Sequence, residues 1–278
     1  MDVVINSDIN TVPEGSLPII NQGDYYHNIL TCLGYPIDFP PVADLLRRYH
    51  GLEGDWLIAS PIYWQATHND AMIMASGSAL QLSDQESQGW FAALVDFVQP
   101  NKVHMHYHDA HTWLIQVKEH PRITAKPVHM LLHQSMTPQL KALDSTLFWQ
   151  RFITENQMMF SGHPLNKARM DRYPINGLWI WGGGQLQSRS KRPFICNDEQ
   201  TFKLAALLST QVSYLQPGES LKKNTVILSS ANQAEGLQTQ LQKYTVRWYW
   251  NNVAYINKPQ HWWLGMWKYI TYSLRLWR

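Results

Sequence analysis

Short apolar segments alternate with longer amphipathic ones through most of the chain, and this alternation limits the possible folds more than any other feature. Residues 3–5, 56–64, 71–75, 177–181 and 225–228 have the content of buried strands. Amphipathic spacing predicts helices over residues 42–49, 83–98, 146–161, 198–215 and 231–244, and residues 103–117 read as a strand or a hairpin. Strands that alternate with helices favour an α/β fold.

The predicted helix at residues 83–98 has the clearest boundaries. The Ser83 hydroxyl can accept a hydrogen bond from an amide of the first turn, and Glu86 stands three residues later. This spacing predicts a capping box, in which the Glu86 carboxylate returns to the backbone at Ser83. Pro100 and Asn101 end the helix.

The composition excludes several classes of protein. The chain has 278 residues, is 45% hydrophobic and has a formal net charge of +2, so it can bury a core and is not intrinsically disordered. Two cysteines, Cys32 and Cys196, are too few for a disulfide framework, and we expect buried structural thiols in a reducing compartment. The sequence contains no run of 18 apolar residues, so it predicts no membrane-spanning helix. Residues 1–10 lack the Lys or Arg of a secretory signal. These observations predict a cytoplasmic protein.

The two ends of the chain carry opposite charge. Residues 1–60 contain eight acidic and two basic residues, whereas residues 236–278 contain six basic and no acidic ones. A basic tail of this kind can bind a polyanion, but both segments are rich in residues typical of a core. We therefore expect the two ends to pair within one fold, and we expect no nucleic-acid binding, because the sequence pI is only about 8.4.

A polar motif precedes the predicted strand at 177–181, and a glycine turn follows it. The residues are His163, Pro164, Asn166, Arg169 and Asn176 before the strand, and Gly182, Gly183 and Gly184 after it. Upstream, residues 33–36 read Leu-Gly-Tyr-Pro and residues 56–61 contain Trp-x-x-x-Ser-Pro. This order of motifs resembles the cofactor-independent, archaeal-type phosphoglycerate mutases. It is still more similar to poorly characterised bacterial proteins described as Rpf-type regulatory or phosphoglycerate mutase-like.

The resemblance implies an α/β fold with an alkaline-phosphatase-superfamily-like core and an inserted, smaller α+β subdomain. The core would comprise residues 1–57 and 139–278, and the inserted subdomain residues 58–138. The resemblance also implies a two-metal phosphotransferase site, in which a serine nucleophile and several Asp and His ligands surround two divalent ions.

The chain departs from that site in several places. Residues 185–278 contain one Asp, Asp198, and one His, His261, while Trp181 stands where the family has an arginine. We therefore expect a degenerate metal site without a cofactor, and a non-catalytic, regulatory protein that binds a phosphorylated small molecule or a protein partner. The alternative is an active phosphomutase or phosphatase with an altered site, which would require a divalent metal.

The motif supplies the candidate residues for binding an anion. They are His163, Asn166, Arg169, Asn176, Gly182, Gly183 and Gly184. Glycines allow backbone amides to approach an anion, and basic residues nearby add positive charge. In the alternative interpretation the glycines form a tight turn, while Pro164 and Asn166 end the preceding helix and His163 caps it.

Four histidines form the densest cluster of possible metal ligands: His104, His106, His108 and His111. On a strand, alternate residues point to one face, and neutral imidazoles there can bind zinc or nickel. The alternative is a half-exposed strand with the histidines on one face. Since one strand rarely supplies a closed site, the half-exposed strand is the favoured interpretation.

The end of the chain predicts an amphipathic, basic helix. Its apolar stripe contains Trp263, Trp267, Ile270, Leu274 and Trp277. Such a helix docks on the protein body or on a second subunit, or it lies at a membrane interface, where indole rings and basic residues suit the headgroup level. A peripheral membrane or assembly protein that acts through this helix is therefore a further alternative.

Overall fold

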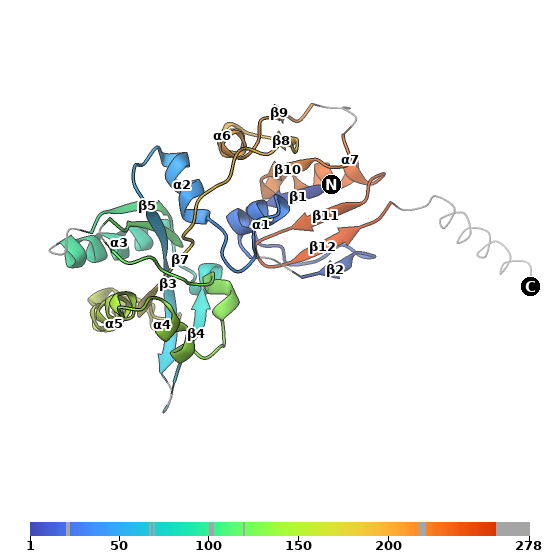
Figure 1. The fold of residues 1–278 in the computed structure, drawn as a ribbon. Helices are drawn as coiled ribbons and strands as arrows, with labels where there is room; N and C mark the ends of the chain where they lie inside the picture. Colours follow the sequence, from blue (N-terminus) through green and yellow to red (C-terminus); the bar gives the residue numbers. More distant parts are fainter. Residues whose placement is uncertain are drawn as a thin grey trace, which may run out of the picture. The chain divides into compact units, whose positions relative to one another are not determined.

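The computed structural model describes residues 1–20, 23–66, 68, 70–99, 103–118, 120–216 and 221–259. The chain forms two compact units, each built around one sheet (Figure 1). Unit 1 consists of Met1–Leu33 and Ser188–Arg278, and unit 2 is Gly34–Gln187. Both units combine helices with a sheet, which confirms the mixed α/β class.

The sheet of unit 1 is largely parallel. Its strand order is β2 (Leu17–Ile19), β12 (Ala254–Asn257), β11 (Val246–Tyr249), β1 (Asp2–Ile5), β10 (Val226–Ser229), β8 (Phe194–Cys196) and β9 (Val212–Tyr214). The strands from β11 to β9 are parallel, whereas β12 pairs antiparallel with β11 and β2 pairs antiparallel with β12. Parallel strands of this kind are buried on both faces, and β1 and β10 are fully buried.

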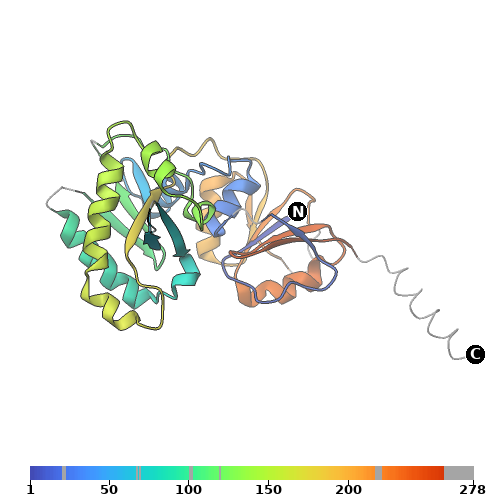
Figure 2. The ribbon, with the colours of Figure 1, turned by 90° about the horizontal axis from the view of Figure 1, so that it is seen from below.

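Helices of unit 1 lie on both faces of that sheet (Figure 2). Alternate residues of β1, Val3 and Ile5, pack in a core cluster with Leu237 and Leu241 of α7 (Ala234–Leu241). The helices α1 (Tyr25–Cys32) and α6 (Glu199–Leu208) contact β1 and β8 and contribute nothing to that cluster. Unit 1 is therefore an open α/β sheet with helices on each side.

A buried ion cluster joins the two ends of the chain within unit 1. The fully buried Asp2 carboxylate accepts hydrogen bonds from Arg192, and from Arg247 at 2.5 and 3.0 Å. Arg192 also donates to the Cys32 carbonyl and, at 2.9 Å, to the carbonyl of Asn224. The Asp2–Arg247 pair confirms that acidic and basic ends of the chain meet inside one fold.

The sheet of unit 2 is antiparallel and is organised around one long strand. β3 (Trp56–Ala66) pairs with β4 (Ala71–Ser76), β6 (Thr112–Gln116) and β7 (Gly177–Trp181), and β5 (Met105–Asp109) forms a hairpin with β6. Because β3 is eleven residues long, β6 and β4 pair with successive parts of it, and β7 pairs along residues 58–62.

The described residues of unit 2 also form the α-helices α2 (Val42–His50), α3 (Asp84–Val98), α4 (Thr137–Ala142) and α5 (Phe148–Ser161). Trp149, Phe152, Ile153 and Phe160 form the buried face of α5, and α5 packs on β7. Trp90 of α3 is fully buried, and its ring stacks on Phe160 with 5.2 Å between centroids. Large aromatic side chains from α3 and α5 thus form much of this core.

The unit boundaries differ from those expected from the sequence. Residues 139–187 were expected in the core together with residues 1–57, and residues 58–138 in the insert. In the structure, β7 pairs with β3 and α5 packs on β7, so residues 34–187 form one unit. The prediction of one helix over residues 198–215 is wrong in its second half, because α6 ends at Leu208 and β9 follows.

Both cysteines are reduced thiols. Cys196 is buried and Cys32 is half-buried. Burial raises the pKa of each thiol to about 12. Because the thiolate is the reactive form, both fit the expected structural role. The predicted helix with the stripe of Trp263, Trp267, Ile270, Leu274 and Trp277 lies outside the described residues. Among the helices that are described, none is long and apolar enough to cross a membrane.

Candidate functional site

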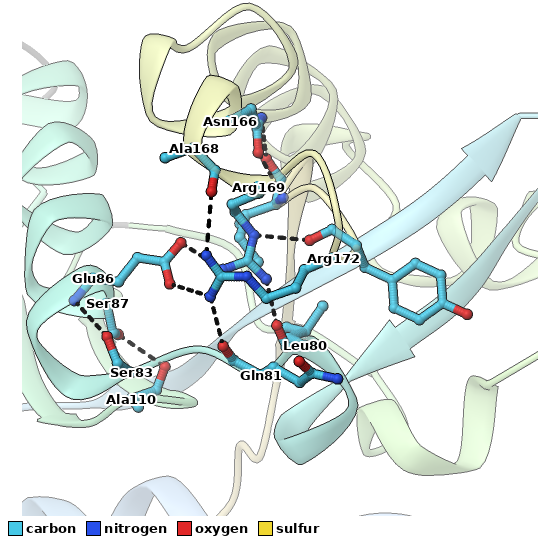
Figure 3. A network of polar contacts seen from close by, with 12 residues as sticks. Leu80, Gln81, Ser83, Glu86, Ser87, Ala110, Asn166, Ala168, Arg169 and Arg172 are labelled. Atoms are coloured by element: carbon cyan, nitrogen blue, oxygen red, sulfur yellow. Dashed lines mark hydrogen bonds and ion pairs between the residues drawn. The ribbon is translucent and has the colours of Figure 1, made fainter.

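Arg169 is buried in unit 2, and partners from the protein itself surround its guanidinium (Figure 3). Nη1 donates to the Glu86 carboxylate at 2.5 Å, Nε donates to the Tyr173 carbonyl at 2.8 Å, and Nη2 donates to the Leu80 carbonyl. The side chain of Arg169 is 0% exposed. Its positive charge is therefore compensated inside the protein rather than presented to a ligand.

Glu86 joins a second arginine to this network (Figure 3). Its other carboxylate oxygen accepts a hydrogen bond from Arg172 at 3.1 Å, and Arg172 also donates to the Gln81 carbonyl at 3.1 Å. The Glu86 amide donates to the Ser83 hydroxyl at 3.2 Å, so half of the predicted capping box is present. The other half is wrong, since the Glu86 carboxylate binds the two arginines.

His163 and Asn166 stabilise the chain just after α5. His163 caps the 3-10 turn Pro164–Arg169, where its Nδ1 accepts from the Leu165 amide at 3.3 Å. Asn166 donates to the carbonyls of Phe160 and Ile175, at 3.0 and 2.9 Å, and accepts from the Ile175 amide at 2.9 Å. Both side chains thus form hydrogen bonds with backbone N–H and C=O groups that the end of α5 would otherwise leave unsatisfied.

Asn176 acts as a strand partner at an irregular point of β3. The pairing of β3 with β4 shifts register between Tyr63 and Trp64. The side chain of Asn176 accepts from the Trp64 amide at 2.9 Å and donates to the Trp64 carbonyl at 2.8 Å. The amide side chain therefore takes the place of a peptide group in the ladder, which gives Asn176 a structural role.

The glycine turn packs closely on β3 and on the start of α2. Gly182 has φ +81°, and a Cβ at this position would lie 2.8 Å from the side chain of Ile58. The Gly182 carbonyl accepts from the Ala43 amide at 3.1 Å. Gly184 has φ +117°, and a Cβ at this position would lie 3.5 Å from the side chain of Pro41. The turn needs glycine for this conformation and close approach, as the tight-turn alternative requires.

The seven predicted anion-binding residues do not meet at one place. His163, Asn166 and Arg169 connect the end of α5 to α3, Asn176 binds Trp64 of β3, and the glycines lie against α2. Their polar side chains bind other parts of unit 2. The geometry favours the structural interpretation of the motif.

The four clustered histidines also separate in the structure. His106 and His108 lie on β5, whereas His104 is exposed before the strand and His111 lies in the hairpin turn. A histidine that the sequence analysis missed, His50 at the end of α2, contacts the pair on β5. Its Nε2 lies 2.8 Å from Nδ1 of His108. Across the described ranges, no three His, Cys, Asp or Glu side chains are grouped so as to hold a metal ion.

Unit 1 gathers polar side chains where its central parallel strands end. Five residues, which we call the amide edge, are Asn6, Asn28, Asn197, Ser229 and Asn251. Asn6 follows β1, Asn197 follows β8, Ser229 ends β10 and Asn251 lies two residues after β11. Parallel neighbours bring these ends to one edge of the sheet, which is where open α/β proteins bind ligands.

Hydrogen bonds hold the amide edge together. The side chain of Asn197 donates to the Ser229 hydroxyl at 2.8 Å. The backbone N–H of Asn251 donates to the Ser7 carbonyl at 2.9 Å. Asn28 connects α1 to this edge, because its Nδ2 donates to the carbonyls of Gly23, at 2.8 Å, and Trp250, at 3.3 Å. The sequence signal for this site was the recurrence of Asn and Ser directly after strands.

Two acceptors at the amide edge have no hydrogen-bond partner in the described part of the chain. They are the Oδ1 atoms of Asn28, which is fully buried, and of Asn197. A buried polar atom without a partner costs about 1–3 kcal/mol, so a donor from a ligand or a bound water is expected there. The chemistry of the edge is neutral hydrogen bonding.

The residues of the amide edge do not fit a pair of divalent ions. Carboxylates and imidazoles form two-metal sites, whereas this edge presents amides and a hydroxyl. The carboxylates of Asp24 and Asp198 are used as helix caps, accepting from the amides of His27 at 3.0 Å and Thr201 at 2.8 Å. The donor set of this edge is therefore unsuited to two-metal chemistry.

Comparison with known proteins finds little similarity. No family model matches the chain, and no curated protein matches it significantly. Among solved structures, a cofactor-independent phosphoglycerate mutase from Thermoplasma acidophilum is 12% identical, with a TM-score of 0.35, over 93% of this chain and 90% of that one.

Proposed function

We propose that this chain is a non-catalytic, phosphoglycerate mutase-like protein that binds a phosphorylated small molecule at the amide edge of unit 1. The motifs around residues 163–184 motivate the family, and with it an alkaline-phosphatase-like core. The observation that carries the binding role is the pair of unpartnered Oδ1 atoms, on Asn28 and Asn197, at the carboxyl ends of parallel strands. A hydroxyl group of a ligand can donate to such atoms.

Helix termini support a ligand with negative charge. The helices α1 and α6 and the 3-10 turn before α7 all begin after strand ends of this sheet. The Asp24 and Asp198 carboxylates already cap the starts of α1 and α6, whereas the 3-10 turn Ala231–Gln233 has no side-chain cap, so the amides of that turn are the ones that would donate to an anion. Without carboxylate ligands for two ions, the same site holds a phosphate ester rather than transferring its phosphoryl group.

Calorimetric titration tests this function. We expect 3-phosphoglycerate, used as a representative phosphorylated hydroxy acid, to bind more tightly than glycerate, and Asn197→Ala to weaken binding at least tenfold. Asn224→Ala is the matched control, since Asn224 is exposed and precedes β10 at the opposite end of that strand. Equal binding by both variants would contradict the assignment of the site. Mutase or phosphatase activity of the unmodified protein with Mn²⁺ or Mg²⁺ would contradict the non-catalytic role.

A further inference from the structure

Lysines gather at the amino ends of the parallel strands of unit 1, at the side of the sheet opposite the amide edge. We call five of them the basic edge: Lys191, Lys222, Lys223, Lys243 and Lys258. One precedes β8, two precede β10, one precedes β11 and one follows β12. Because neighbouring parallel strands start at the same edge of a sheet, segments distant in sequence bring these lysines to one side.

Backbone hydrogen bonds fix the starts of these strands beside one another. The Asp2 amide donates to the Thr225 carbonyl at 3.0 Å, and the Val226 amide donates to the Pro193 carbonyl at 2.9 Å. On the other side of β1, β12 runs antiparallel to β11 and ends beside the start of β11. Neighbouring strands lie about 4.8 Å apart, so the basic edge extends over about 19 Å from β12 to β8.

The charge of the basic edge is largely uncompensated. All five lysines are exposed, and within the described ranges none of them forms an ion pair. The buried Asp2 carboxylate at this edge binds the arginines Arg192 and Arg247. Glu14, which is three residues before β2, is the other acidic residue that the structure describes there. Charges of one sign along one edge produce a joint positive potential, which attracts an extended anionic surface.

The sequence that follows β12 indicates which anionic surface this is. Residues 260–278 lie outside the described residues, and they contain four tryptophans, three Lys or Arg residues and no acidic residue. Tryptophan is enriched at membrane–water interfaces, and basic residues are attracted to anionic phospholipids. A duplex nucleic acid would attract the lysines, but it offers no apolar layer for the tryptophans. Because β12 ends at the basic edge, this segment of the chain begins there.

We propose that the basic edge of unit 1 docks on the surface of a membrane that contains anionic phospholipid. The lysines supply the attraction, and each lysine near such a surface raises the binding constant about fivefold. Residues 260–278 continue from the same edge and add apolar and basic residues. The amide edge lies at the other ends of the strands, so it points away from the membrane. Membrane docking does not depend on ligand binding at the amide edge.

Co-sedimentation of the full chain with vesicles tests membrane docking. We expect binding to vesicles of phosphatidylcholine with about 30% phosphatidylserine, and we expect Lys222→Gln with Lys223→Gln to weaken it about 25-fold. Lys141→Gln with Lys167→Gln is the matched control, because it removes the same charge from two exposed lysines of unit 2. Equal losses in the two double variants, or equally tight binding to vesicles of phosphatidylcholine alone, would overturn the proposal.

Two further measurements use the unmodified protein and remain informative if a substitution impairs folding. Binding to the mixed vesicles should weaken at least tenfold when the salt concentration rises from about 0.1 M to about 1 M, because salt screens exposed charges. Binding that salt leaves unchanged would contradict an electrostatic surface. Tighter binding to a duplex oligonucleotide than to the mixed vesicles at the same salt concentration would contradict the choice of a membrane as the partner.

Discussion

Replacing Glu86 by glutamine removes the negative charge that compensates Arg169 while preserving the size of the side chain. Arg169 is 0% exposed, and within the described residues it then faces only neutral acceptors, which are the amide oxygen of the new side chain and the carbonyls of Leu80 and Tyr173. Guanidinium groups in general stay charged inside proteins. The substitution therefore leaves a positive charge inside unit 2 without a counter-ion.

The expected cost follows from the burial of the two partners. Breaking a buried ion pair by removing one charge costs about 3–5 kcal/mol. Glu86 is 18% exposed, so we expect the lower end of that range, about 3 kcal/mol, for Glu86→Gln. Arg172→Gln is the matched control: that side chain is 27% exposed and contacts the same carboxylate, and its loss should cost at most about 1 kcal/mol.

Urea denaturation at pH 7, followed by tryptophan fluorescence, measures both changes in the free energy of unfolding. Trp90 lies on α3, the same helix as Glu86, and its ring is 5.0 Å from that of His163, so the signal reports this region. A loss below about 1 kcal/mol for Glu86→Gln, or equal losses in both variants, would refute the reasoning. The double variant Glu86→Gln with Arg169→Met should lose less than the sum of the single changes, because no unpaired charge remains.

Three further predictions concern backbone conformation, capping and pairing in unit 2. Gly182→Ala should lower the free energy of unfolding in urea by about 3 kcal/mol, because φ is +81° and the new Cβ would lie 2.8 Å from the side chain of Ile58 in β3. Gly89→Ala, within the helix α3, is the control and should raise the free energy of unfolding by about 0.5–1 kcal/mol. Burial would raise the pKa of Asp144, but hydrogen bonds from Thr146 and the start of α5 outweigh it and lower the pKa. The native carboxyl therefore holds its proton less tightly than the unfolded one, so the stability that it contributes is present above about pH 4 and is lost as the pH falls below that value. We expect Asp144→Asn to lower the free energy of unfolding by about 1 kcal/mol at pH 7. Urea unfolding at pH 7 and at pH 3 should show that the difference between the variant and the unmodified protein shrinks at the lower pH. Asn176→Ala should cost about 1–3 kcal/mol by the same assay, because a strand amide and carbonyl lose their partner.

The sequence predicted those elements whose pattern is local. The strand at 177–181 and the helix at 83–98 have apolar runs or caps that neighbouring residues specify, and both are confirmed. The hairpin of β11 and β12 was missed, although its aromatic residues and the Asn251-Asn252 turn are typical of a hairpin. Trp248 and Trp250 from this part of the chain fill the core beside α7.

Contacts between distant residues could not be predicted in the same way. Glu86 had the correct spacing for a capping box, which is a local interaction of moderate strength. The uncompensated charge of buried Arg169, 83 residues away, outweighs that interaction and takes the carboxylate. His50 joined His106 and His108 for a similar reason, since no sequence pattern shows that the end of α2 lies against β5.

The polar residues of the motif have structural roles in this chain. His163, Asn166, Arg169 and Asn176 each bind backbone groups or a carboxylate within unit 2, so these residue types are needed for the structure whether or not any reaction occurs. A resemblance carried by them therefore speaks for a shared architecture and leaves activity open. The binding role that we propose depends instead on the carboxyl edge of the sheet of unit 1, where amides stand on the strand ends. Carboxylates would have to replace those amides before that edge could hold two metal ions.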